Sequence, residues 1–171
     1  MSTGTLVGML HGDNVALRPA VLADLPELGR IQATPEVAAQ WGHDAITAAD
    51  LDEPDTEVFV VLLDDRIVGA IQWYEHADPD FRHAGIDIYL DPAVHGKGLG
   101  TDAVRTMARY LITAKAFHRL IIDPAAANAR AIRCYTKVGF RPVGIMRQYW
   151  RDPEGVWRDG LLMDLLAHEL T

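Results

Sequence analysis

One stretch near the middle of the chain constrains the fold most: a strand pattern, a glycine-rich loop and a helix pattern follow one another directly. Over residues 86–91 apolar and polar side chains alternate, as in a strand with one buried face, and Pro92 ends it. Apolar residues then recur at helical spacing over 100–115. The free N–H groups of a helix's first turn attract anions, so this loop is predicted to bind a phosphate or pyrophosphate.

The spacing of the glycines separates this loop from two other phosphate-binding motifs. No Gly-Lys-Ser/Thr is present, so the loop is not a P-loop. Gly96, Gly98 and Gly100 do not have the G-x-G-x-x-G spacing of a dinucleotide-binding loop. A glycine pair alone more often marks a tight turn, so the interpretation depends on the strand before it and the helix after it. Gly98 and Gly100 let the backbone approach an anion without an intervening side chain.

Patterns along the rest of the chain predict a single α/β domain over residues 1–171, with a mixed, mostly antiparallel sheet flanked by helices. Predicted strands cover residues 14–18, 58–63, 66–74, 86–91, 118–122, 141–150 and 157–165. Predicted helices cover residues 24–31, with a cap at Ala23 or Asp24, 36–41, 100–115 and 129–138. Tight turns are expected at residues 64–65 and 152–155, and Gly139 is expected to end the last helix in a left-handed conformation.

Composition narrows the class of protein. Of 171 residues, 49% are hydrophobic, enough for a core, yet no apolar run approaches the ~18 residues of a membrane helix. The single cysteine excludes an internal disulfide, and the seven histidines form no spaced pair that resembles a metal site. A net charge of -8 argues against nucleic acid and suits a cationic partner, although such charge more often serves solubility. We expect a soluble cytoplasmic protein without a metal or membrane contact; monomer and homodimer stay open.

The glycine loop and a second motif resemble those of the GNAT acetyltransferases. In that family a Gln/Arg-x-x-Gly-x-Gly/Ala loop binds the pyrophosphate of acetyl-CoA. Gly98 and Gly100 match its last two fixed positions, and His95 stands at the first. The second motif, Asn-x-x-Ala-x-x-x-Tyr followed by Lys-x-Gly-Phe, matches residues 128–140 at every fixed position. The resemblance extends over nearly the whole chain and implies a GNAT fold that transfers acetyl from acetyl-CoA to an amine.

The resemblance also implies which residues contact acetyl-CoA. A backbone N–H near the end of the central strand is expected to polarise the acetyl carbonyl. The implied contacts are Tyr89, Leu90, His95, Gly96, Lys97, Gly98, Leu99, Gly100, Thr101 and Asn128. From the residues alone, Asn128 also fits an N-cap and Lys97 also fits a solvated surface lysine.

Transfer from a thioester to an amine needs a proton donor for the leaving thiolate. The resemblance assigns this role to Tyr135, which shares the apolar face of its predicted helix with Ile132 and Val138. The same spacing fits a tyrosine packed in the core. Cys134 is a possible nucleophile, but its chain neighbours include no histidine base. We therefore expect an inert buried thiol and direct transfer in a ternary complex.

Within the superfamily the chain is most similar to the aminoglycoside 6'-N-acetyltransferases. The similarity lies in residues 37–42, 85–87, 95–100, 123–128 and 130–135. It implies that Asp87 faces the 6'-amine with a catalytic role, and that Trp41 and Asp123 belong to the substrate site. Asp87 alternates with Ile86 and Ile88, and Asp123 follows a strand, where α/β sheets bind ligands. Carboxylates suit a polyamine, although Asp123 before a proline also fits an ordinary turn.

Other acceptors remain possible. The loop after Tyr74 is shorter than in the aminoglycoside enzymes, so Glu75, Asp78 and Asp80 are further candidates for substrate contact. One alternative is a GNAT enzyme that acetylates a protein N-terminus, a polyamine or a small metabolite amine. Another is a non-catalytic acyl-CoA sensor, against which the presence of Tyr135 counts.

Overall fold

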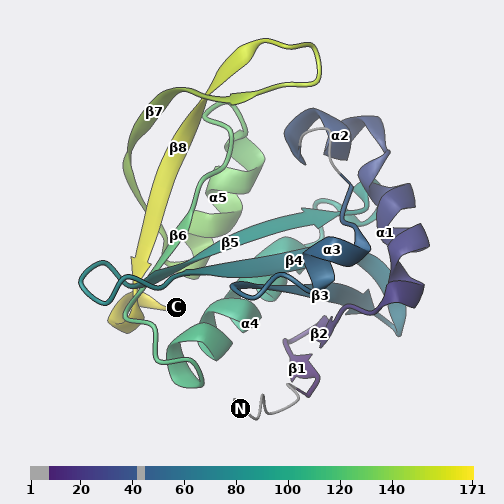
Figure 1. Ribbon diagram of the computed structural model, residues 1–171, viewed down its shortest axis with the longest axis horizontal. Coiled ribbons are helices and arrows are strands. Elements are labelled where there is room, and N and C mark those ends of the chain that lie inside the picture. The colour runs from purple at the N-terminus through teal and green to yellow at the C-terminus, as the bar shows by residue number, and fades with distance from the viewer. Residues whose placement is uncertain (1–7, 42–44) are drawn as a thin grey trace.

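The computed structural model describes residues 8–41 and 45–171, which form one eight-stranded sheet with helices on both faces (Figure 1). The strand order is β1-β2-β3-β4-β5-β6-β8-β7. The strands are β1 (Leu10–His11), β2 (Ala16–Pro19), β3 (Thr56–Leu63), β4 (Arg66–His76), β5 (His83–Leu90), β6 (Arg119–Ile122), β7 (Arg141–Arg151) and β8 (Trp157–Leu166). Every neighbouring pair is antiparallel except β5 and β6, so the predicted mixed, mostly antiparallel α/β sheet is confirmed.

Four helices of the described chain follow the predicted order, and a further short helix over Ala48–Leu51 was not predicted. The helices are α1 (Leu25–Gln32), α2 (Pro35–Trp41), α3 (Ala48–Leu51), α4 (Leu99–Thr113) and α5 (Ala129–Val138), with 3-10 turns η1 (Leu22–Asp24), η2 (Pro92–Val94) and η3 (Ala167–Glu169). Part of the similarity around Trp41 falls at Gly42, which lies outside the described residues.

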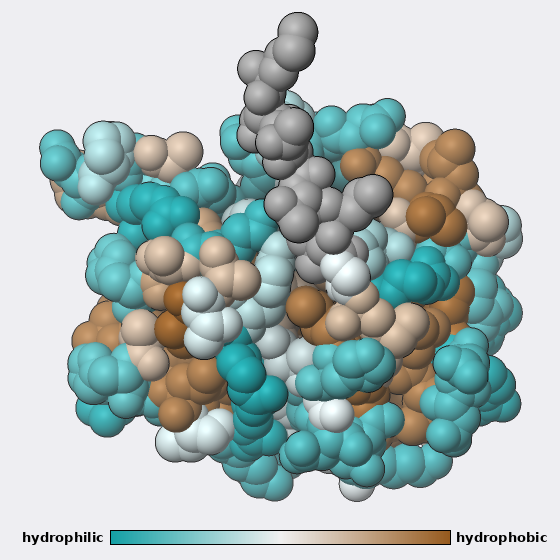
Figure 2. All heavy atoms as spheres, turned by 90° about the horizontal axis from the view of Figure 1, so that it is seen from below, coloured by the Kyte–Doolittle hydropathy of each residue, from teal (hydrophilic) through white to brown (hydrophobic). Residues whose placement is uncertain are grey.

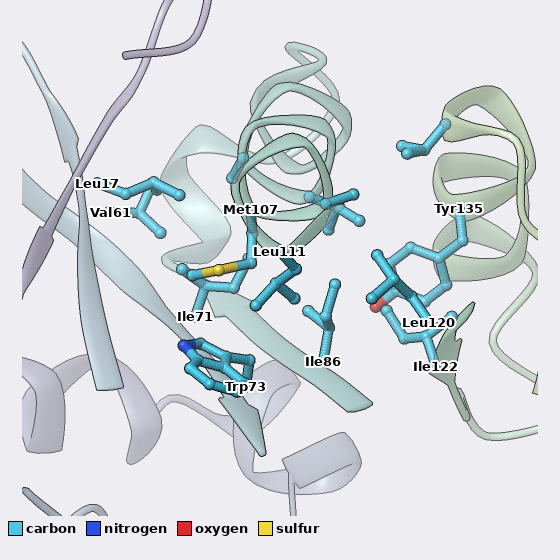
Figure 3. Close-up of a cluster of buried hydrophobic side chains, with 14 of the residues drawn as sticks. Leu17, Val61, Ile71, Trp73, Ile86, Met107, Leu111, Leu120, Ile122 and Tyr135 are labelled. Carbon is cyan, nitrogen blue, oxygen red and sulfur yellow. The ribbon is translucent and has the colours of Figure 1, made fainter. Parts of the chain in front are cut away.

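Alternation along the strands buries both faces of the sheet. Val61 and Ile71 point toward α4, where they pack with Met107 and Leu111 (Figure 3). The strand side chains in between belong to a second cluster on the opposite face, in which they pack with residues of α1 and α2 and with Ile46. The cluster consists of Leu28, Ile31, Val37, Ile46, Val58, Val60, Leu62, Ala70 and Tyr89. Because successive strand residues point to opposite faces, one alternating pattern supplies both cores. Burying a side chain such as Leu111 contributes about 1.5–3 kcal/mol.

The two parallel strands separate after a short paired region. β5 and β6 are in register at Ala84 with Leu120 and at Gly85 with Ile121. Beyond Gly85, β5 stays paired with β4 up to Leu90, but no register with β6 is found among the described residues. The carboxyl halves of these two strands therefore diverge, and they open a gap in the middle of the sheet.

The sequence predicted N-caps for two helices, α1 and α5, and the two cap residues form different bonds in the structure. Asp24 does not cap α1 through its side chain; its carboxylate pairs with Arg18 at 2.8 Å and accepts the Val21 N–H. The predicted cap position at Asp24 is confirmed, but the carboxylate makes no bond to the first turn of α1 because Arg18 of β2 and the Val21 N–H occupy it. The cap on α5 is correct, since Asn128 Oδ1 accepts the Ala131 N–H at 3.1 Å.

Figure 2 shows one face of the molecule, on which hydrophilic side chains cover most of the surface and apolar ones form separate patches. Scattered apolar side chains are normal on a protein surface. Among the described residues, no helix is long and apolar enough to cross a membrane.

Candidate active site

A cavity of about 350 Å³ lies where β5 and β6 diverge. Its walls come from α2, β5, the glycine loop with the start of α4, the end of β6 and α5. Most residues proposed from the sequence line it: Trp41, Asp87, Tyr89, Leu90, His95, Gly96, Gly98, Leu99, Gly100, Thr101, Asp123, Asn128 and Tyr135. Lys97 is exposed and is not part of the lining.

The glycines of the loop serve different purposes. Gly96 and Gly98 have φ of 76° and 77°, in the left-handed region that side chains disfavour, and Gly98 is the residue before the first turn of α4. A Cβ on Gly98 would meet no atom within 4 Å, so the backbone conformation requires glycine there. A Cβ on Gly100 would lie 3.4 Å from Cys134 Sγ, an ordinary contact. The free N–H groups at the start of α4 therefore border the cavity without side-chain cover.

Gly98→Ala is expected to lower affinity for acetyl-CoA by about tenfold, which is ~1.4 kcal/mol. The methyl group would stand where the loop backbone borders the cavity, and left-handed backbone at alanine costs ~1–2 kcal/mol. Calorimetry of acetyl-CoA binding and thermal unfolding measure the two effects. The matched control is Gly29→Ala in α1, where a Cβ also meets nothing within 4 Å. Equal acetyl-CoA affinity of the two folded variants would contradict a phosphate site at this loop.

His95 links the loop to β5 and α5. Its Nε2 lies 2.9 Å from the Leu90 carbonyl oxygen, and Arg130 Nη1 lies 2.7 Å from its Nδ1. Because a guanidinium only donates, Nδ1 accepts and the ring proton is on Nε2, which donates to Leu90. Burial lowers the pKa of His95, and the Arg130 charge lowers it further, which favours this neutral form. A neutral histidine thus orients Arg130, a cavity residue that sequence reasoning missed.

Asp87 faces the cavity from β5. Its carboxylate accepts a hydrogen bond from Gln72 Nε2 on β4 at 3.0 Å. Burial raises the pKa of Asp87 to about 6; the Gln72 bond opposes this rise, and the charge of Asp123 adds to it. Asp87 is therefore a carboxylate that titrates close to neutral pH and gains from a cation beside it.

Asp123 reaches the same cavity from the end of β6. Tyr149 on β7 donates to its Oδ2 at 2.5 Å. Burial raises the pKa of Asp123, and the Tyr149 bond opposes the rise. Tyr74 on β4 lies close enough that the charges of Asp87 and Asp123 add to the effect of burial in raising its pKa. The structure thus brings together two carboxylates and two tyrosines from four different strands or strand ends.

Tyr135 extends from α5 toward Leu120 and Ile122 of β6 (Figure 3) and is 7% exposed. It lines the cavity and also packs against Phe140, with ring centroids 6.4 Å apart. Burial, with smaller contributions from nearby groups, raises the pKa of Tyr135, so its hydroxyl remains protonated at neutral pH. A proton donor for a leaving thiolate needs that state.

Cys134 is half-buried and lines the cavity, where its Sγ accepts a hydrogen bond from Thr101 Oγ1 at 3.3 Å. Burial raises the pKa of the Cys134 thiol, which reduces the thiolate fraction at neutral pH. This environment agrees with the expected unreactive thiol, although the residue is closer to the cavity than a core cysteine would be.

The α2 wall is aromatic and polar. Trp41 and Tyr89 meet edge to face with ring centroids 4.7 Å apart. Asn128 Nδ2 lies 3.4 Å from Gln40 Oε1, so the residue that caps α5 also spans the cavity to α2.

The acidic residues after Tyr74, which were further candidates for substrate contact, lie outside the cavity. Glu75 pairs with Arg82 at 2.8 Å, and Asp78 and Asp80 are exposed. None of these three is among the lining residues.

The chain is similar to known proteins in both sequence and structure. The model of the acetyltransferase (GNAT) family matches residues 24–140. An aminoglycoside N(6')-acetyltransferase type 1 of Klebsiella pneumoniae is 31% identical over 77% of this chain and 76% of its own length. A spermidine N(1)-acetyltransferase of Escherichia coli K12 is 26% identical over 94% and 90%.

A solved structure of AAC(6')-Ib in complex with ribostamycin and coenzyme A superposes with a TM-score of 0.74, 28% identity and coverage of 92% of this chain and 97% of that chain. The family match over residues 24–140 contains all of β5, α4, β6 and α5 and the loops that connect them. The chain belongs to the acetyltransferase (GNAT) family.

Proposed function

We propose that this acetyl-CoA-dependent N-acetyltransferase acetylates a primary amine of a cationic small molecule, with the 6'-amine of an aminoglycoside as the favoured acceptor. The observation that carries the proposal is the pair of carboxylates, Asp87 and Asp123, which share one cavity with the glycine loop and Tyr135. Burial makes both reluctant to ionise, so a cationic ligand gains most beside them. The similarity to aminoglycoside N(6')-acetyltransferases over 77% of the chain supports the choice of acceptor.

In the proposed reaction the pyrophosphate of acetyl-CoA lies against the loop from His95 to Gly100, with Arg130 beside it. The acetyl thioester lies between the diverging halves of β5 and β6. Asp87 binds the ammonium of the acceptor and accepts or relays its proton, because only the neutral amine attacks the carbonyl. The amine nitrogen forms the new bond to the carbonyl carbon, the C–S bond breaks, and Tyr135 protonates the leaving thiolate. The acylated nitrogen then loses its extra proton, which restores the Tyr135 hydroxyl directly or through water. No acyl-enzyme at Cys134 is required.

The second candidate acceptor is a polyamine. The similarity to a spermidine N(1)-acetyltransferase covers more of the chain, 94%, although at a lower identity of 26%. Two carboxylates in one cavity also suit a flexible polycation. We further propose that residues 1–171 act as one cytoplasmic catalytic unit whose net charge of -8 disfavours nucleic acid.

A panel of amines tests the acceptor. Acetyl-CoA is incubated with kanamycin, tobramycin, spermidine or a short peptide with a free N-terminus, and release of the CoA thiol is followed. Paromomycin, which has a hydroxyl at the 6' position, controls for the site of acetylation. Turnover of kanamycin and tobramycin but not paromomycin is expected. Turnover of spermidine or the peptide alone would contradict the aminoglycoside proposal.

Asp123→Asn is expected to raise the KM for kanamycin about tenfold and leave the KM for acetyl-CoA unchanged. Asp123 neither accepts nor donates a proton in the proposed reaction, so its charge contact is expected to act on ground and transition states alike. A hydrogen-bonded charge contact contributes about 1.5–3 kcal/mol, which sets this scale. Asp55→Asn, at an exposed carboxylate outside the lining, is the matched control. Equal kinetics of both variants would remove Asp123 from the acceptor site.

A further inference from the structure

The β7–β8 hairpin contains a backbone irregularity next to the cavity. The register between the two strands breaks between Met146 and Trp150. Within this break Gln148 has φ of 50°, in the left-handed region. Such a conformation at a residue other than glycine costs ~1–2 kcal/mol and persists only where its surroundings hold it. Here the Gln148 N–H donates to Asp159 Oδ1 on β8 at 2.8 Å.

The irregularity directs Tyr149 at Asp123. The ring of Tyr149 lies over Gly160 of β8, where a Cβ would come within 2.7 Å of Tyr149 Cδ1. A glycine in β8 is therefore required for this position of the ring. The hydroxyl then reaches Asp123 Oδ2 at 2.5 Å, which is the length of a strong hydrogen bond to a carboxylate.

The same part of β8 also holds the loop that carries Asp123. The Ala126 N–H donates to the Asp159 carbonyl at 2.9 Å, and the Leu161 N–H donates to the Pro124 carbonyl at 2.9 Å. Residues 159–161 thus support both the carboxylate loop and its hydrogen-bond donor. Tyr149 itself is not part of the cavity lining, and its hydroxyl bonds a side chain that is, Asp123.

We propose that Tyr149 is a positioning residue for the acceptor: its hydrogen bond orients the carboxylate of Asp123 toward the cavity and favours the charged form. This inference rests on the proposed acceptor role of Asp123. The titratable groups that face Asp123 are Tyr74 on β4, Asp87 on β5, Tyr135 on α5 and Tyr149 on β7. Among them Tyr149 donates the side-chain hydrogen bond to Asp123 that stabilises its charged form. Without that bond, burial beside a second carboxylate favours the neutral acid, which binds a cation weakly.

Tyr149→Phe keeps the ring and removes only the donor. We expect the KM for kanamycin to rise about tenfold, in the range of a lost hydrogen bond to a charged group, with kcat and the KM for acetyl-CoA unchanged. The acidic limb of kcat/KM, to which Asp87 also contributes, should extend to higher pH because Asp123 becomes harder to ionise. Tyr110→Phe, a half-buried tyrosine of α4 outside the cavity lining, is the matched control.

A measurement without substrate separates this inference from the choice of acceptor. Carbon NMR titration of the side-chain carboxyls is expected to show a higher pKa for Asp123 in Tyr149→Phe than in the wild type. If kanamycin is not acetylated, the aminoglycoside proposal fails, spermidine replaces it as the probe, and the titration still decides the role of Tyr149. An unchanged Asp123 pKa overturns the inference.

A double-mutant cycle tests whether Tyr149→Phe acts through Asp123 or damages the site in a general way. If Tyr149 acts through Asp123, Asp123→Asn should raise the acceptor KM less in the Tyr149→Phe background than in the wild type. Fully additive effects, or an equal loss of acetyl-CoA affinity in Tyr149→Phe, would overturn the inference.

Discussion

Tyr135→Phe is expected to lower kcat by about 10² to 10⁴, the usual contribution of one general acid, and to leave acetyl-CoA affinity nearly unchanged. The substitution removes a hydroxyl group and keeps the ring that packs against Phe140. Since burial keeps this hydroxyl protonated, its loss leaves the thiolate without a positioned donor. Single-turnover kinetics with the best acceptor of the panel, together with calorimetry of acetyl-CoA binding, measure the two quantities.

The matched control is again Tyr110→Phe, which removes a hydroxyl group outside the cavity lining. If Tyr135→Phe turns over at the wild-type rate, Tyr135 is a packing residue only. Acetyl label trapped on Cys134 during turnover would instead contradict direct transfer, because it would show a covalent intermediate on the neighbouring side chain.

Asp87→Asn is expected to have opposite effects on activity and stability. It should lower kcat/KM for the acceptor by about 10² or more, because the amine loses both its ionic partner and its proton acceptor. It should also raise the free energy of unfolding at pH 7 by ~1–3 kcal/mol. The reason is that a carboxylate held in a site that raises its pKa makes the folded protein less stable wherever that carboxylate is charged.

The direction of this stability change follows from the pKa values of Asp87 in the unfolded and folded states. Unfolded aspartate titrates near ~3.9, and folded Asp87 titrates at about 6. The folded state therefore holds the proton more tightly, and the contribution of Asp87 to stability is complete below ~3.9 and is lost as pH rises through about 6. Chemical unfolding at pH 4 and pH 7 should show the gain of Asp87→Asn at pH 7 only. For the wild type, kcat/KM should fall as pH drops through about 6.

Asp102→Asn is expected to change the stability in the opposite direction to Asp87→Asn. Asp102 is a buried carboxylate of α4 that accepts the backbone N–H groups of Asp13, Asn14 and Val15 at 2.7–3.0 Å. Replacing it should destabilise the protein by about 1–3 kcal/mol, because the asparagine amide has one oxygen that accepts and an NH2 group that only donates. Loss of stability in Asp87→Asn, similar to that of Asp102→Asn, would identify Asp87 as a structural carboxylate.

Local sequence signals predicted the elements that depend on neighbouring residues. The two aspartates at residues 64–65 both have positive φ, 49° and 61°, as a two-residue hairpin turn requires. Asn128 caps α5, and Gly139 ends it with φ of 118°. The glycine loop before α4 is also local: its conformation depends on Gly96 and Gly98 having no side chain.

The resemblance to the GNAT family placed the candidate residues, and the fold brought them to one cavity. Tyr135 on α5, Asp87 on β5 and Asp123 after β6 are separated by up to 48 positions, counted from 87 to 135, and all line it. Periodicity identified the apolar faces that bury α4 and α5 against the sheet. It contained no signal for the divergence of β5 and β6, because two strands with good alternation are equally able to pair along their whole length.

The tertiary structure alone decided which polar side chains support the site. Gln72 bonds Asp87, Arg130 bonds His95 and Tyr149 bonds Asp123 across 15, 35 and 26 positions. A helix or strand pattern records only burial and backbone conformation, so a hydrogen bond between distant side chains leaves no periodic trace in the sequence. The sequence by itself therefore determined the elements, the glycine loop and the family motifs. The pKa values of the carboxylates and the strained backbone at Gln148 follow from burial and contacts that exist only once the sheet has assembled.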